Sequence, residues 1–161
     1  MLERSSLSPV LAPLQEVLRR RRLTIAVAES CTGGLLAAAL TELPGSSESF
    51  LGGMVTYANE AKIEVLGVDE AMIGAHGAVS AVVAAQMARG ATTVFGADVG
   101  IGVTGIAGPD SEEDKPVGLT FIGARHGDQG LVREYNWTGD RAFNRAASVE
   151  AAIKLAAEIL S

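Results

Sequence analysis

The chain has 161 residues, of which 48% are hydrophobic and 20% are charged, and its formal net charge is −6. This length suits one domain with a real core, and the composition is typical of globular rather than disordered chains. Net negative charge opposes nonspecific binding to a phosphate backbone, so nucleic acid is not an expected ligand. No apolar run approaches the roughly 18–20 residues of a membrane span, and we expect a cytoplasmic protein without a membrane partner.

The first third of the chain predicts a helix, a strand, a tight turn, a helix and a second strand. Apolar residues recur at helical spacing over about 8–22, and this segment ends in four arginines that suit a helix C-terminus. We expect the helix of residues 1–22 to pack on a single domain that covers 1–161. The next strands are predicted over 23–28 and 50–56, with a short helix over 35–40 between them. Gly52-Gly53 predicts a bulge or a close backbone contact in the second strand.

The rest of the chain continues this alternation. Alternating valine or isoleucine and glycine predicts a strand over 99–104 that is packed tightly on its glycine face. Strands over 117–125 and 131–136 are expected to form a hairpin, joined by the turn 127–130. Further helices are predicted over 59–66, from 69, from 80 to about 96, and after 140, and each begins at a residue that is a good N-cap. These N-cap residues are Asn59, Asp69, Ser80 and Asp140.

The order of these elements predicts an α/β fold. We expect a single three-layer α/β/α domain with a mixed, mainly parallel sheet and a C-terminal hairpin and helix. The single cysteine, Cys31, excludes an internal disulfide and fits a reducing compartment.

The strongest local signal is the turn 29–34, Glu-Ser-Cys-Thr-Gly-Gly, between a predicted strand and a predicted helix. Free backbone N–H groups at a helix start converge on one point, which suits an oxyanion or a phosphate. Ser30 held at this turn could attack a carbonyl while N–H groups of the Thr32-Gly33 turn stabilise the oxyanion. The alternative is that Ser30 or Thr32 is only an N-cap.

A serine nucleophile needs a base, and Tyr57 with Lys62 is the most suggestive pair because both could face the Ser30 turn. Lysine acts as a base only if burial or a neighbouring cation lowers its pKa. The alternatives are a solvated helix lysine and an ordinary half-buried strand tyrosine. His76 would be the conventional base but precedes a glycine in a helix-ending turn, where a structural role is favoured. His126 falls in the predicted hairpin turn and is expected to be solvated.

Two further segments could hold an anionic ligand. The glycine-rich stretch 102–109 ends a strand, where backbone N–H groups can approach a phosphate or ribose, but it lacks the P-loop and dinucleotide fingerprints. Arg141 and Arg145 lie one helical turn apart and could supply positive charge, unless they are solvated surface residues. The acidic cluster 112–114 is expected to be solvated in a mobile loop over 110–115. No ligand spacing predicts a metal site.

Together the motifs resemble the nicotinamide-nucleotide amidohydrolases, which also form the C-terminal domain of the competence/damage-inducible protein CinA. The matching segments occur in the family's order and cover nearly all of the chain from residue 23. They are 28–34 (AESCTGG), 55–62 (VTYANEAK), 66–68 (LGV), 76–80 (HGAVS), 105–109 (GIAGP), 115–118 (KPVG) and 139–141 (GDR).

This resemblance implies hydrolysis of the carboxamide of nicotinamide mononucleotide to nicotinate mononucleotide and ammonia, a step in pyridine nucleotide recycling. It implies Ser30 as nucleophile, Lys62 and Tyr57 as proton-transfer partners, a small-molecule nucleotide substrate, no cofactor and a homo-oligomer. The residues expected to contact the substrate come from the Ser30 turn, the glycine-rich strand end and the last helix. They are Cys31, Thr32, Gly33, Gly34, Thr104, Gly105 and Arg141.

Other interpretations remain open at this point. In one, Cys31 is the nucleophile and Glu29 and Lys62 are its acid/base partners, an arrangement known in other amidases. In another, the chain is a non-catalytic nucleotide-binding or regulatory module linked to competence or the DNA damage response. The chain departs from the family's fuller pattern in two places. The loop after Pro109 lacks extra glycines, and the larger N-terminal domain with its associated pyrophosphatase activity has no counterpart in this sequence.

Overall fold

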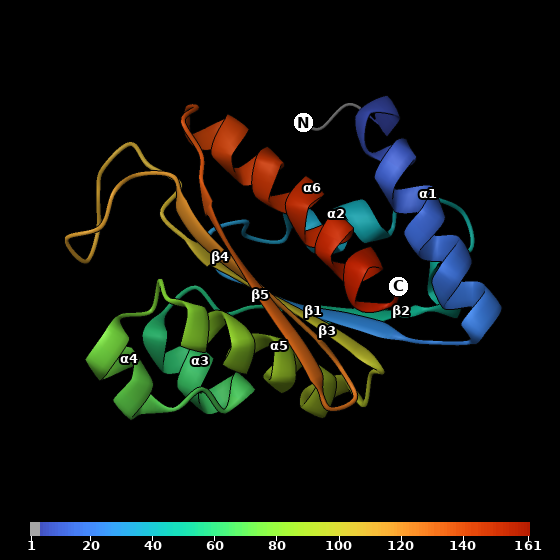
Figure 1. The fold of residues 1–161 in the computed structure, drawn as a ribbon, viewed down its shortest axis with the longest axis horizontal. Helices are drawn as coiled ribbons and strands as arrows, with labels where there is room; N and C mark the ends of the chain where they lie inside the picture. Colours follow the sequence, from blue (N-terminus) through green and yellow to red (C-terminus); the bar gives the residue numbers. More distant parts are fainter. Residues whose placement is uncertain (1–3) are drawn as a thin grey trace.

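The chain folds into a five-stranded sheet between two layers of helices (Figure 1). The computed structural model describes residues 4–161, with side chains from Leu7 onward. The strands are β1 (Ile25–Glu29), β2 (Phe50–Val55), β3 (Val99–Gly105), β4 (Leu119–His126) and β5 (Gln129–Asn136). The helices are α1 (Arg4–Arg21), α2 (Leu35–Leu40), α3 (Asn59–Leu66), α4 (Glu70–His76), α5 (Ala81–Phe95) and α6 (Arg141–Ile159), with a 3-10 turn, η1, at Ser46–Glu48.

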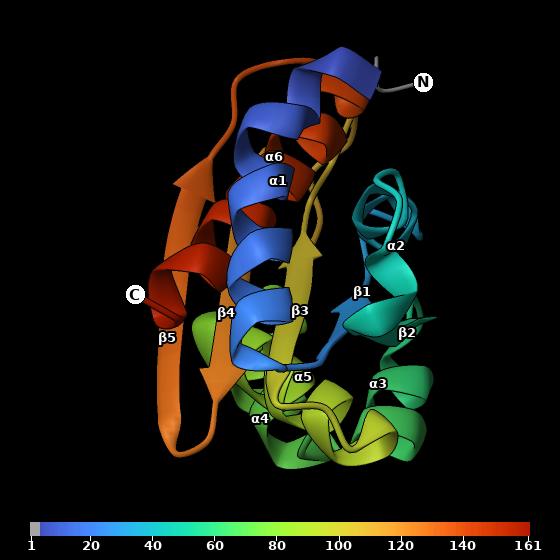
Figure 2. The ribbon, with the colours of Figure 1, turned by 90° about the vertical axis from the view of Figure 1, so that its right-hand side faces the viewer.

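The sheet has the strand order β2-β1-β3-β4-β5, with β2 and β5 at its two edges (Figure 2). Strand β1 is parallel to both β2 and β3, whereas β4 is antiparallel to β3 and to β5. Only β4 therefore runs against the other strands. The predicted three-layer α/β fold, with a mixed, mainly parallel sheet and a C-terminal hairpin and helix, is confirmed.

Helices α1, α2 and α6 cover one face of the sheet, and α3, α4 and α5 cover the other (Figure 1). The larger core lies under α1 and α6, where leucines of α1 at helical spacing meet the buried face of α6. Helix α1 begins earlier than the predicted residue 8 and contains Pro9 and Pro13. The buried residues of α1 are Leu7, Leu11, Leu14 and Leu18.

The predicted glycine face of β3 brings α5 unusually close to the sheet. A Cβ at Gly102 would lie 2.5 Å from the carbonyl oxygen of Ala84 on α5, and a Cβ at Gly123 of β4 would lie 2.6 Å from the same oxygen. Any side chain there would push the helix away from the sheet. The tight packing predicted for this face is confirmed.

Two of the four predicted helix caps are confirmed and two differ. The carboxylates of Asp69 and Asp140 accept hydrogen bonds from the backbone N–H groups of Ala71 and Phe143, at 2.9 and 2.8 Å. Asn59 is the first residue of α3 rather than its N-cap, and the cap position is held by Ala58 without a side-chain hydrogen bond. Ser80 stands at the cap of α5, but its hydroxyl donates to the carbonyl of Gly77.

The hairpin and the second strand follow the sequence pattern with small shifts. Strands β4 and β5 pair up to His126 and Gln129, so the turn between them is shorter than predicted. The register of β2 against β1 shifts between Phe50 and Gly52, which confirms an irregularity beside Gly52-Gly53. A Cβ at Gly53 would lie 2.7 Å from the side chain of Val27, so a close contact is also present.

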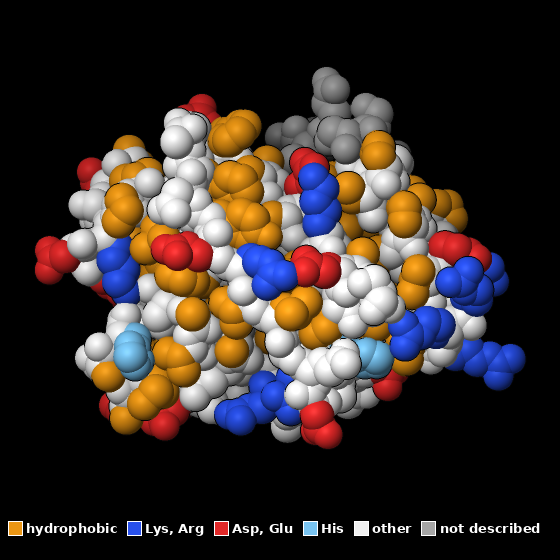
Figure 3. Space-filling model, viewed as in Figure 1, with side chains coloured by type: hydrophobic (Ala, Val, Ile, Leu, Met, Phe, Trp, Pro, Cys, Tyr) orange, Lys and Arg blue, Asp and Glu red, His pale blue; other side chains and the backbone are white. Residues whose placement is uncertain are grey.

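The described helices include none that is both long and apolar enough to cross a bilayer. On the face shown in Figure 3, acidic and basic side chains are interspersed over the helices and the β5 edge.

We predict that Gly102→Ala lowers the free energy of unfolding by about 1–3 kcal/mol, because the added methyl group overpacks the contact between β3 and α5. Urea denaturation of the two proteins measures the difference. The matched control is Gly74→Ala in α4, where a Cβ meets no atom within 4 Å, and alanine there should raise stability by up to about 1 kcal/mol. Equal stability of Gly102→Ala and the wild type would contradict this account of the packing.

Candidate active site

The candidate site lies where the parallel strands end on the same edge of the sheet. Ser30 follows β1, Tyr57 comes two residues after β2, and Thr104 is the penultimate residue of β3. Ligands of open α/β sheets bind at the carboxyl ends of the strands, where loops from neighbouring strands meet. These residues line one pocket of about 300 Å³, together with Lys62 of α3.

Lys62 reaches back from α3 to the Ser30 turn. Its Nζ lies 3.1 Å from Ser30 Oγ, 2.8 Å from the carbonyl oxygen of Thr56 and 3.0 Å from that of Tyr57. The side chain is buried, with 1% of its surface exposed. The structure therefore brings together the serine and the lysine that the sequence suggested as nucleophile and base.

Burial also changes the acidity of Lys62. Desolvation lowers the pKa of its ammonium below the ordinary value, and this outweighs the opposing influence of Cys31, Glu113 and Glu112. A neutral amine has two N–H groups and one lone pair. With the two carbonyls accepting the N–H groups, the lone pair is left to accept the proton of the Ser30 hydroxyl. The geometry therefore suits a general base.

The Ser30 turn is held by Glu29, which the sequence did not identify as a cap. The buried carboxylate of Glu29 accepts hydrogen bonds from the backbone N–H groups of Gly34, Leu36 and Ala37, at 3.2, 2.9 and 3.0 Å. It thereby satisfies the first turn of α2. The alternative in which Ser30 or Thr32 caps this helix is wrong, because the cap position is held by Gly34 in a left-handed conformation.

This cap changes which N–H groups are free to stabilise an oxyanion. The N–H groups at the start of α2 are taken by Glu29, and that of Gly33 donates to the carbonyl of Ser30 at 3.0 Å. The N–H groups of Cys31 and Thr32 donate to no backbone or side-chain oxygen within the described chain. The predicted Thr32-Gly33 donor pair is therefore not available at the pocket, because the Gly33 N–H group is bonded within the turn and Thr32 is fully buried outside the pocket lining. Cys31 is the residue of this trio that lines the pocket.

Arg145 of α6 donates hydrogen bonds to the backbone of the same turn. Its Nε and Nη2 donate to the carbonyl oxygens of Cys31 and Thr32, each at 3.1 Å. A Cβ at Gly33, where φ is +58°, would come within 3.2 Å of this guanidinium. The structure does not place Thr32, Gly33 and Gly34 at the pocket wall, although we expected them to contact the substrate.

The remaining predicted binding residues do reach the pocket. Thr104, Gly105 and Cys31 line it, and the buried Thr104 hydroxyl donates to the carbonyl oxygen of Ala78 at 2.9 Å. Arg141 also lines it, and its guanidinium donates to the Gly108 carbonyl at 2.6 Å and to the Tyr57 hydroxyl at 3.2 Å. Unlike Arg145, Arg141 therefore brings positive charge to the pocket wall.

Several lining residues were missed by sequence reasoning. Glu112 and Glu113 were assigned to a solvated mobile loop, but both line the pocket, and Glu113 is bonded to the backbone of the 76–80 segment. Acidic residues in a polar loop give no local signal of such docking. The other missed residues are Asn59, Ala78 and Val79, whereas Ile106, Ala107 and Gly108 belong to the glycine-rich stretch 102–109 that the sequence offered as a ligand site.

The two histidines lie outside this site. His76 is exposed and contributes only its carbonyl oxygen, which accepts a hydrogen bond from Lys115 at 2.6 Å. His126 is half-buried at the end of β4. Among the described residues, no three histidine, cysteine, aspartate or glutamate side chains are grouped so that they could hold a metal ion.

Comparisons with known proteins agree with the motifs and with the fold. The family model for the CinA C-terminal domain matches residues 8–160. The chain belongs to the CinA C-terminal domain family. A competence-damage inducible protein of Moorella thermoacetica is 53% identical over 140 residues, which is 86% of this chain and 34% of that protein. The CinA-like protein of Chlorobaculum tepidum is 51% identical over 144 residues, again 86% and 34%.

The chain thus spans about a third of the length of the curated relatives it matches. A solved structure of a CinA superfamily protein from Klebsiella pneumoniae superimposes with a TM-score of 0.93 at 33% sequence identity. The match covers 96% of this chain and 98% of that one. Family membership therefore extends over the strands and helices that build the Ser30 pocket.

Cys31 is a poor nucleophile in this setting. Burial raises the pKa of its thiol to about 11, against smaller lowering effects of its own backbone N–H, Arg145 and Lys62. At pH 8 only roughly one thiol in a thousand is then ionised, and the thiolate is the reactive form. The carboxylate of Glu29, its partner in the alternative mechanism, is already bonded to three backbone N–H groups.

We therefore predict that Cys31→Ala keeps activity towards the amide substrate within about threefold of wild type, because the reactive pair does not include the thiol. We also predict that iodoacetamide alkylates Cys31 in the folded protein at least about tenfold more slowly than in urea. Mass spectrometry measures the alkylation rate. Loss of all turnover in a folded Cys31→Ala protein would instead favour the cysteine mechanism.

Proposed function

We propose that this chain hydrolyses the carboxamide of nicotinamide mononucleotide to nicotinate mononucleotide and ammonia, with Ser30 as the nucleophile. The observation that carries the proposal is the buried Lys62 amine, 3.1 Å from Ser30 Oγ, in a pocket at the strand ends. Serine is a weak nucleophile unless an adjacent base accepts its proton. The choice of substrate rests on the resemblance of the seven sequence motifs to the nicotinamide-nucleotide amidohydrolases.

In the first half of the reaction, neutral Lys62 takes the hydroxyl proton as Ser30 Oγ attacks the amide carbonyl carbon. The N–H group of Cys31, which lines the pocket, donates to the oxyanion that forms. The Lys62 ammonium then returns this proton to the amide nitrogen, and the C–N bond breaks to release ammonia. An acyl ester on Ser30 remains.

In the second half, Lys62 accepts a proton from water as the water oxygen attacks the ester carbonyl. The ester bond breaks, Ser30 regains its proton from Lys62, and nicotinate mononucleotide leaves. Tyr57 is placed to assist at the pocket wall. Its carbonyl orients Lys62, and its phenol accepts a hydrogen bond from Arg141, which leaves the phenol proton free to be donated to the substrate.

The decisive measurement is ammonia release from nicotinamide mononucleotide by the purified, metal-stripped protein, with Ser30→Ala beside it. We expect release by the wild type and a loss of at least about a thousandfold in the variant, because the covalent route is removed. Ser47→Ala, an exposed serine outside the pocket, is the control. A folded wild type that binds the mononucleotide without releasing ammonia would instead indicate a nucleotide-binding module.

The lowered pKa of Lys62 predicts how kcat/KM depends on pH. Only its neutral form accepts the serine proton, so kcat/KM should rise with pH and level off above the pKa of Lys62, which desolvation lowers from its ordinary value of 10.5. Lys62→Arg should cost about 10²–10⁴ in kcat/KM, since a guanidinium stays protonated at any pH used. Lys154→Arg, on the exposed side of α6, is the matched control. Near-normal turnover by a folded Lys62→Arg protein would exclude the base role.

A further inference from the structure

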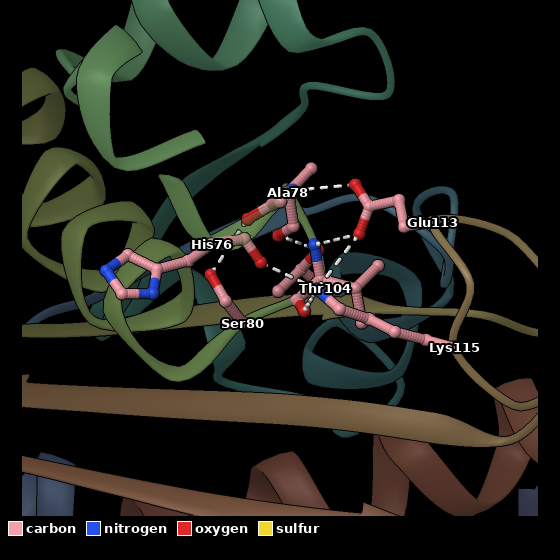
Figure 4. Close-up of polar contacts among 8 residues, drawn as sticks. His76, Ala78, Ser80, Thr104, Glu113 and Lys115 are labelled. Atoms are coloured by element: carbon pink, nitrogen blue, oxygen red, sulfur yellow. Dashed lines mark hydrogen bonds and ion pairs between the residues drawn. The ribbon is translucent and has the colours of Figure 1, made fainter. Parts of the chain in front are cut away.

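A carboxylate of the protein itself occupies one wall of the pocket. Glu113 accepts hydrogen bonds from two consecutive backbone N–H groups, those of Ala78 at 2.7 Å and Val79 at 3.1 Å (Figure 4). The ammonium of Lys115 lies 3.3 Å from Glu113 Oε2. Two adjacent N–H groups and a cation thus converge on one negatively charged group.

The donors belong to a rigid part of the fold. The same Lys115 ammonium donates to the carbonyl oxygens of His76 and Val79, each at 2.6 Å, and the Ala78 carbonyl accepts the hydrogen bond of buried Thr104. The segment from His76 to Val79 is therefore held from two sides. Glu113 is therefore not the sole partner that positions its two N–H groups.

Glycine makes the approach of this carboxylate possible. At Gly77, where φ is +80°, a Cβ would come within 2.6 Å of Glu113 Oε2 and 2.8 Å of Lys115 Nζ. A side chain there would fill the space in which the carboxylate lies. The concave surface is thus built to admit a negatively charged group, in the manner of backbone anion nests.

The Glu113 carboxyl group is ionised, and its side chain is not enclosed by the core. Desolvation raises the pKa of its carboxyl, but the N–H groups of Val79 and Ala78 and the Lys115 ammonium outweigh this and hold the pKa below its usual value. Its side chain is 29% exposed. Glu113 belongs to the 110–115 loop, which lies outside the strands and helices. The carboxylate can leave without breaking the core.

We propose that the N–H groups of Ala78 and Val79 at the pocket wall, with the Lys115 ammonium behind them, form a phosphate subsite, which Glu113 fills as an internal stand-in until a phosphate monoester displaces it. The inference rests on the proposed function, because Ser30 and the Ala78-Val79 segment line the same pocket. Phosphate oxygens accept from N–H groups and ammonium as carboxylate oxygens do, so each donor stays paired after the exchange. Arg141, which does line the pocket, already donates to Gly108 and Tyr57.

The test is calorimetric titration with nicotinate mononucleotide, which the enzyme does not consume, and with the matching riboside that lacks phosphate. Glu113→Ala removes both the competitor and its charge, so we expect about tenfold tighter binding of the mononucleotide and an unchanged affinity for the riboside. Lys115→Met should weaken mononucleotide binding about tenfold. Asp114→Asn is the control: it removes a charge from the same loop outside the pocket wall, and we expect less than a twofold effect.

If Glu113 serves only to hold the loop, Glu113→Ala will bind both ligands equally or more weakly than wild type, and the proposed subsite is overturned. Glu113→Gln, which keeps the shape of the side chain, should still bind the mononucleotide several-fold more tightly and guards against misfolding of the alanine variant. The titration is independent of turnover. If Glu113→Ala binds the mononucleotide more tightly but neither it nor the wild type releases ammonia, the subsite is supported and the amidase is rejected. If the wild type releases ammonia but Glu113→Ala binds no more tightly, the amidase is supported and the subsite is rejected.

Discussion

The candidate site depends on the burial of the Lys62 amine, which has no carboxylate hydrogen-bond partner among the residues that the structure describes. Transferring an ammonium group into a protein interior costs several kcal/mol unless it is paired, so burial favours the neutral form. Two carbonyl oxygens, from Thr56 and Tyr57, accept its N–H groups and aim the remaining position at Ser30. For this to happen, the connection after β2 must bring α3 back over the end of β1. The parallel pairing of β1 and β2 provides that geometry.

Two charged side chains, Glu29 and Arg145, hold the Ser30 turn in place. Glu29 ends β1 and takes the free N–H groups of α2, while Arg145 of α6 takes the carbonyls of Cys31 and Thr32 on the other side of the turn. Both groups are thus satisfied by backbone partners, which is what burial of a charge demands. Their combined effect is a turn held from both sides, in which Ser30 Oγ lies 3.1 Å from Lys62 Nζ and Cys31 lines the pocket. Such preorganisation is the usual basis of oxyanion stabilisation.

The pocket wall opposite the turn obeys the same rule of paired charges. The 110–115 loop contributes a carboxylate and an ammonium, Glu113 and Lys115, and the backbone of the 76–80 segment bonds to both. Because every polar group there has a partner, a ligand must exchange hydrogen bonds rather than simply add them. A ligand with a negative group is the natural competitor for the carboxylate.

Periodicity and turn chemistry in the sequence were sufficient for the fold class, most element positions, and the placement of Ser30 at one strand end and of Lys62 in the helix that follows the neighbouring strand. These features are local, or follow from parallel strands sharing one edge. Three contacts were decided only by the tertiary structure. Glu29 caps α2, and Arg145 donates to the carbonyl oxygen of Cys31, 114 residues earlier in the chain. Glu113 accepts a hydrogen bond from the backbone of Ala78, 35 residues earlier. A side chain satisfies its charge with whichever partner the fold brings near, and no local pattern records that partner. The lowered pKa of Lys62 has the same origin, since desolvation depends on the atoms that surround the amine in three dimensions.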